Sequence, residues 1–213
     1  YTKMDFLFKM IGEILNSSKL EDTKRLYEIV ASVKSRAQVN LTGAGHSTAV
    51  LRAAAYSSPM AAFQDEMAGI GYYQFIEKLE KDFEQRKEET VEELCKLMKK
   101  ILRPENFMIS YTGERESLET VQKLAGAVKA GLGTEPVEKS KEKLTCTKKN
   151  EGFKTSGQVQ YVAQTGNFKK KGLEYTGALE ILKVILSYDY LWMNLRVKGG
   201  AYGCMSSFLR TGD

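Results

Sequence analysis

The spacing of hydrophobic residues changes at Pro104, and this change constrains the fold more than any other feature of the sequence. Before Pro104, apolar residues recur every three or four positions, which is typical of amphipathic helices. Four helices are expected there, over MDFLFKMIGEIL, KLEDTKRLYEIVASVKSRAQVNL, AGHSTAVLRAAAYSSP and residues 70–102. The third should end at Ser58, because a residue that precedes a proline avoids the helical conformation. The fourth should break near residues 85–89, where five polar residues interrupt its apolar face.

After Pro104 the apolar residues alternate with polar ones, which is the pattern of half-buried strands. Three strands are expected, in NFMISYTG, SGQVQYVAQTGNF and AYGCMSSFL, and KLTCT is at most a short fourth. Two helices are expected between them, in ESLETVQKLAGAVKAGLG, which should end at Gly131 and Gly133, and in EYTGALEILKVILSYDYLWMNLRV. This order of elements predicts an αβ architecture in layers.

The net charge of +5 is concentrated between Glu138 and Lys171, where nine lysines stand against three acidic residues. This stretch has two interpretations, an RNA-binding segment and a solvated linker. Nucleic-acid-binding surfaces usually interleave basic residues with aromatic ones, whereas Phe153 and Phe168 are the only aromatic residues here apart from Tyr161 of a predicted strand. We therefore interpret residues 134–155 as a connector between two units, and we expect no nucleic-acid partner.

The sequence predicts no metal or nucleotide site within the chain. His46 is the only histidine, so it cannot form the paired-histidine motif of zinc proteases. The three cysteines are too widely spaced for a CxxC site, and their odd number indicates a reducing compartment. We expect His46 to lie at a helix start that Ser47 or Thr48 helps to cap. The segments TGAG and SGQ lack the Lys-Ser/Thr pair of a phosphate-binding loop.

The termini and the apolar runs bear on location. No apolar run reaches the roughly 20 residues that span a bilayer, so no membrane partner is expected. The first residues carry acids and lack a small-residue cleavage site, which predicts a cytoplasmic location. The chain starts without Met and stops at LRTGD, directly after a predicted strand, so we expect a piece of a longer protein.

The stretch LRVKGGAYGCMSSF places Arg196 at the end of a predicted helix and Tyr202 at the start of a predicted strand. Gly199 and Gly200 lie between them and permit a backbone reversal, after which both polar heads can reach one point. A guanidinium can hold a carbonyl or carboxylate with two hydrogen bonds, and a phenol can donate another to an oxygen that gains negative charge. The alternative is a helix end with a surface arginine and a half-buried tyrosine, and spacing alone favours it.

The segment YLWMNLRVKGGAYGCMSSF closely resembles the C-terminal half of the presequence protease and falcilysin group of metallopeptidases, in the pitrilysin/insulinase clan. In that group the signature R-V-K-G-G-A-Y-G supplies an arginine and a tyrosine that face the zinc site across a closed chamber. Arg196 and Tyr202 match this pair, and Gly199, Gly200 and Gly203 match its loop. Two further segments resemble the group's third domain, GHSTAVLRAAAYSSPMAAFQDEMAGIGYYQFIEKL its helical part and NFMISYTGERESLETVQKLAGAVKAGLG its closing strand and helix.

The resemblance implies an α+β fold with layered helices on a mainly antiparallel sheet. Residues 1–133 would form the latter part of one insulinase-type domain, residues 134–155 the lysine-rich connector, and residues 156–213 the opening part of the next domain. The implied function is a non-catalytic, substrate-enclosing C-terminal fragment of a zinc-dependent oligopeptidase that degrades short unfolded peptides.

The resemblance also implies where the chemistry and the partners lie. Neither catalytic residues nor metal ligands are expected in this chain, and zinc would be bound elsewhere in the full-length enzyme. The expected partners are the N-terminal catalytic half of the same polypeptide and the peptide substrate. The alternative function is that of a degenerate peptidase-fold binding or scaffold protein without proteolytic activity.

Overall fold

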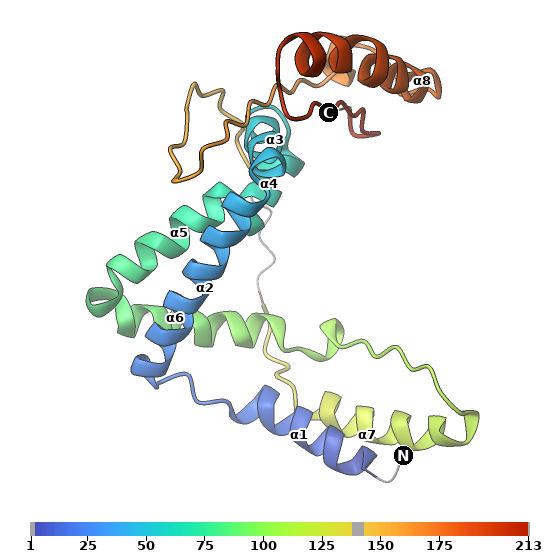
Figure 1. Cartoon of the computed structure of the whole chain (residues 1–213). Helices are drawn as coiled ribbons and strands as arrows, with labels where there is room; N and C mark the ends of the chain where they lie inside the picture. The colour runs from blue at the N-terminus through green and yellow to red at the C-terminus, as the bar shows by residue number, and fades with distance from the viewer. Residues whose placement is uncertain (1–2, 138–142, 213) are drawn as a thin grey trace. The chain divides into compact units, whose positions relative to one another are not determined.

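The computed structural model describes residues 3–137 and 143–212, and these form two compact units (Figure 1). The first unit combines residues 3–34 with residues 76–137, and the second combines residues 35–75 with residues 143–212. Each unit is therefore built from two stretches that are distant in the sequence. In the described part of the chain, no helix is both long enough and apolar enough to cross a membrane.

The first unit is organised around two helices that lie side by side, α1 (Met4–Ser17) and α7 (Leu118–Ala130) (Figure 1). Phe8 of α1 and Val121 and Val128 of α7 are buried together. Burial of apolar side chains on a common face is what fixes the pairing of two amphipathic helices. The predictions of these two helices from their apolar spacing are confirmed, including the end of the second at Gly131, which is its C-cap.

A second contact in this unit explains where a long predicted helix divides. Residues 70–102 form two helices, α5 (Ile70–Lys81) and α6 (Phe83–Ile101), which Asp82 separates. Phe83 is only 1% exposed, and its ring lies 5.4 Å from the ring of Tyr27 in α2 (Thr23–Gly43). The predicted break at residues 85–89 was therefore placed too late, because the chain turns where Phe83 must be buried and not where the apolar pattern lapses.

In the second unit, α3 (Gly45–Ala55) packs against α4 (Pro59–Ala68). The predicted end of a helix before Pro59 is confirmed, and the same position starts the next helix. The Ser58 side chain accepts a hydrogen bond from the Ala61 backbone N–H at 3.4 Å, and proline at the first helical position needs no such partner. The sequence analysis did not predict α4.

The C-terminal helix of this unit also confirms its prediction. It begins as α8 (Ala178–Ile185) and continues as η4 (Leu186–Lys198), which is π-helical. Long π-helical runs are uncommon, and π-helical turns are frequent at functional sites. Short 3₁₀ turns, η1 (Pro104–Asn106), η2 (Arg115–Ser117) and η3 (Lys169–Lys171), complete the regular structure of the described residues.

The prediction of a mainly antiparallel sheet is wrong for the part of the chain that the structure describes. The segments expected as strands, around residues 107–111, 159–163 and 201–209, have no regular secondary structure there, and KLTCT has none either. A strand needs a neighbouring backbone to pair with its N–H and C=O groups, and apolar alternation shows only that one side is buried. Phe107 and Tyr111 illustrate the difference, because they pack against the cluster of α1 and α7 instead of a sheet.

The predicted domain boundaries at residues 133 and 156 stay a prediction. The predicted connector, residues 134–155, includes residues 138–142, which lie outside the described residues. Its described parts have no regular secondary structure, and they are not free of contacts. The guanidinium of Arg103 donates to the backbone oxygen of Glu135 in the first unit, and Glu151 is held by α3 in the second.

Candidate functional site

The end of η4 shows why two consecutive glycines follow this helix. Gly200 has a φ of 73°, in the left-handed region that residues with a side chain avoid. Its N–H donates to the Arg196 oxygen at 3.0 Å, and the next N–H, of Ala201, donates to the Leu195 oxygen at 2.9 Å. Gly199 is needed for space, because a Cβ atom there would lie 2.7 Å from the Leu195 oxygen. The expected backbone reversal is therefore present.

The structure places Arg196 and Tyr202 on either side of this reversal. The Arg196 guanidinium lies over the ring of Trp192, with Cζ 4.1 Å from the ring centroid. Tyr202 is 95% exposed, so its predicted half-buried setting is not observed. Among the described residues the two side chains make no hydrogen bond with each other, and neither has an ion-pair or hydrogen-bond partner elsewhere. Both polar groups are thus available to a ligand.

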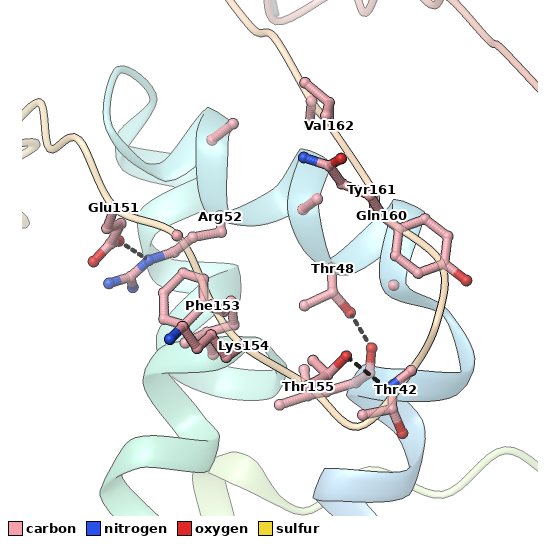
Figure 2. A pocket seen from close by; sticks show the side chains of 18 of the residues that line it. Thr42, Thr48, Arg52, Glu151, Phe153, Lys154, Thr155, Gln160, Tyr161 and Val162 are labelled. Atoms are coloured by element: carbon pink, nitrogen blue, oxygen red, sulfur yellow. Dashed lines mark hydrogen bonds and ion pairs between the residues drawn. The ribbon is translucent and has the colours of Figure 1, made fainter. Parts of the chain in front are cut away.

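A groove of about 1260 Å³ lies elsewhere in the second unit, between helices and an extended segment. The end of α2, the whole of α3 and the start of α5 form one wall, and residues 149–163 form the other. Figure 2 shows this extended segment running past α3, with Glu151 and Phe153 beside Arg52. The segment is the opening of the stretch that the sequence analysis expected to be a strand, and here it covers a helical surface.

Arg52 joins the two walls of the groove through two carboxylates. Its Nη1 lies 2.6 Å from Asp65 in α4, and its Nε lies 2.6 Å from Glu151 in the extended segment. Its Cζ also lies 5.7 Å from the centroid of the Phe153 ring and 5.8 Å from that of Tyr56. The Arg52 side chain is 12% exposed, so these charge-assisted bonds are weakly screened by solvent.

The ionisation of this cluster follows from its contacts. Burial alone would lower the pKa of Arg52, and the bonds from Glu151 and Asp65 outweigh it and raise that pKa. The hydrogen bond from Arg52 lowers the pKa of the Glu151 carboxyl, although burial acts in the opposite direction. Burial and the hydrogen bond to Glu151 raise the pKa of the Tyr56 phenol, which donates to that carboxylate. At neutral pH the cluster is therefore a charged arginine with two carboxylates and a neutral tyrosine.

The residues that could hold a metal ion do not come together. His46 lies at the start of α3 as expected, with its ring 6.2 Å from that of Tyr161. The expected side-chain cap is wrong, because Ala44 precedes the helix and the Thr48 hydroxyl instead donates to the Leu41 oxygen at 3.1 Å. Across residues 3–137 and 143–212 no three histidine, cysteine or acidic side chains are placed to bind one metal ion. The donor set of these residues does not fit zinc.

Sequence reasoning missed the Arg52 cluster entirely. Arg52 and Asp65 are 13 residues apart, and Arg52 and Glu151 are 99 apart, so no short motif connects them. One local signal was available. Asp65 shortly precedes Gly69-Ile70-Gly71, and an acidic side chain near glycines is suited to accept backbone N–H groups at a helix start.

Comparison with known proteins gives consistent matches along the chain. Residues 1–79 match a family model described as peptidase-associated, and residues 150–212 match one described as PreP C-terminal domain. Protein HypA of Clostridium perfringens is 35% identical over 211 residues, which cover 99% of this chain and 22% of that protein.

Two relatives carry the name presequence protease. The chloroplastic/mitochondrial presequence protease 1 of Arabidopsis thaliana is 27% identical over 97% of this chain and 19% of its own length. The mitochondrial presequence protease of Yarrowia lipolytica is 26% identical over 96% of this chain and 21% of its own length. The chain thus spans about a fifth of the length of the curated relatives that it matches.

Proposed function

This chain belongs to the presequence protease-like peptidases, and we propose that it is a non-catalytic part of a zinc-dependent oligopeptidase that helps to enclose short unfolded peptides. The main support is the end of η4, where Arg196 and Tyr202 flank a glycine reversal and neither side chain is engaged within the described residues. In this proposal the zinc ligands and the residue that activates water lie in another part of the polypeptide.

The proposed role of the pair is to bind a peptide carbonyl oxygen. The guanidinium of Arg196 offers N–H donors in a fixed plane, and the Tyr202 hydroxyl can donate one more hydrogen bond. Donors aimed at an oxygen that gains negative charge stabilise the transition state more than the ground state. The structure does not bring the two groups together, so the proposal requires that a bound peptide lies between them.

The proposed partners are the N-terminal catalytic half of the same polypeptide and the peptide substrate, without nucleic acid or membrane. We propose a cytoplasmic location for the protein. The names of the two presequence proteases point to mitochondria and chloroplasts instead. Fractionation of cells that express the full-length protein distinguishes these locations.

The test is peptide hydrolysis by the whole polypeptide that contains this chain. Tyr202→Phe removes one hydrogen-bond donor from an exposed ring, so we expect the melting temperature to be unchanged. If this donor acts on the oxyanion, kcat should fall by about 10²–10³, equivalent to about 2.7–4 kcal/mol. Arg196→Lys keeps the charge and loses the planar fork, so it should raise KM.

The matched control is Tyr188→Phe, which changes another exposed tyrosine, 70% accessible, on the same helix. It should leave kcat and KM at wild-type values. Zinc content is measured for every variant, because the proposal places the zinc ligands outside this chain. Wild-type kcat/KM in a folded, zinc-loaded Tyr202→Phe protein would refute the role of the tyrosine.

A further inference from the structure

Trp192 and Arg196 form the closest contact of an arginine with an aromatic ring among the described residues. The guanidinium carbon lies 4.1 Å from the centroid of the indole, whereas the other such contacts lie at 5.7 and 5.8 Å. The two residues are four positions apart on η4, so they share one side of the helix. Trp192 is 41% exposed and is the only tryptophan in the sequence.

The contact orients the guanidinium without using its hydrogen-bond donors. A cation within about 6 Å of a ring face is attracted by the ring, most strongly by tryptophan. A guanidinium can also stack on a ring through its face, while its N–H groups lie in its plane. Binding to the ring and donation to a ligand therefore do not compete.

A second arginine of the same unit shows the contrast. Arg52 is held by two carboxylates at 2.6 Å, which occupy its N–H donors. For Arg196 no carboxylate within the described residues plays this part, and the indole is its recorded contact. A long side chain at an exposed helix end otherwise samples many rotamers, and ordering it on binding costs free energy.

We propose that Trp192 is a positioning residue for Arg196, whose guanidinium it holds with the N–H donors presented to a carbonyl or carboxylate oxygen of a peptide. This inference rests on the proposed function of Arg196. It extends that function to a residue that does not itself touch the peptide oxygen. The ring limits the guanidinium to few orientations before the peptide arrives, so less entropy is lost when the peptide binds.

The test is a double-mutant cycle in the whole polypeptide, with KM and kcat for peptide hydrolysis as readouts. Trp192→Leu removes the ring and should raise KM by about two- to thirty-fold, the range that cation–π contacts span. Trp192→Phe keeps a ring face and should restore most of the loss. In an Arg196→Gln background, Trp192→Leu should change KM by less than about two-fold, because no cation remains to be positioned.

The matched control is Tyr190→Leu, which removes another exposed aromatic ring of η4, one that has no recorded cation over it. It should leave KM unchanged, and melting temperatures should show that all variants are folded. If Arg196→Gln impairs hydrolysis while Trp192→Leu has no effect, or has the same effect in both backgrounds, the positioning role is refuted and the proposed function stands. If Arg196→Gln has no effect on KM or kcat, the role proposed for Arg196 is refuted, and this inference with it.

Discussion

Arg52 and Asp65 form an ion pair of 2.6 Å in which the carboxylate side chain is only 2% exposed. The same carboxylate accepts hydrogen bonds from the backbone N–H groups of Ile70 at 3.0 Å and Gly71 at 3.1 Å, at the start of α5. Asp65 therefore satisfies orphan donors at a helix start and compensates a poorly hydrated cation. It links α3, α4 and the start of α5 through one side chain.

We predict that Asp65→Asn destabilises the protein strongly. The amide keeps one acceptor oxygen and loses the charge that Arg52 needs, and removal of one partner from a buried ion pair typically costs about 3–5 kcal/mol. Since Glu151 still pairs with Arg52, we expect a value near the lower end. Chemical denaturation gives the free energy of unfolding.

The control for this substitution is Glu28→Gln, which breaks an exposed ion pair of 2.7 Å with Arg25. Exposed pairs contribute about 0–1 kcal/mol, because solvent screens them. Equal effects of the two substitutions would contradict the assignment of Asp65 as a buried anchor.

Glu151 should make stability depend on pH at the acid end. Its hydrogen bond from Arg52 lowers its pKa in the folded state below the ordinary value of 4.5. The unfolded chain then binds a proton more readily, so this contribution is complete above the ordinary pKa and is lost as pH falls through the folded pKa. We expect the stability difference between wild type and Glu151→Gln to be constant near neutral pH and to shrink below about pH 4.5.

Urea unfolding of both proteins from pH 7 to pH 3 tests this expectation. The comparison of two proteins cancels the titration of other carboxyl groups. A difference that grows as the pH falls would show that Glu151 is not held as a carboxylate by Arg52.

The same carboxylate should protect the extended segment from trypsin. Lys149 and Lys154 flank Glu151 and Phe153, which contact Arg52 on α3. Proteolysis requires local opening of the chain, and the opening is less frequent when the segment is anchored. We predict that Glu151→Gln accelerates cleavage after these two lysines, relative to cleavage after Lys143 in the same sample. Peptide mapping by mass spectrometry measures the rates, and unchanged ratios would contradict the anchor.

The sequence predicted helices well and strands poorly, for a physical reason. The helices of MDFLFKMIGEIL and ESLETVQKLAGAVKAGLG need only their own backbone hydrogen bonds and one apolar face, both of which are encoded locally. Residues 107–111 carry an equally regular pattern, but a strand also needs a partner that the local pattern does not name. Phe107 and Tyr111 are partly buried as the alternation indicates, against helices.

The candidate site divides in the same way. The helix end at Arg196 and the reversal at Gly199 and Gly200 were predicted from adjacent residues, because a glycine turn is a local property. The contact of Arg196 with Trp192 has helical spacing and could have been found from the sequence. The pairing of Arg52 with Glu151 could not, since it depends on how a distant segment returns to α3.

The final prediction concerns Gly200 and its φ of 73°. A Cβ atom at this position would meet no other atom within 4 Å, so any cost of Gly200→Ala comes from the backbone conformation alone. Left-handed backbone conformations cost residues with a side chain about 1–2 kcal/mol. Gly203→Ala is the matched control, because it also meets open space and lies outside the left-handed region. We expect Gly200→Ala to lower the free energy of unfolding by about 1–2 kcal/mol and Gly203→Ala to change it by less than about 0.5 kcal/mol. The fluorescence of Trp192, the single tryptophan of this chain, reports unfolding next to the turn. Equal stability of the two variants would show that the reversal does not require glycine at position 200.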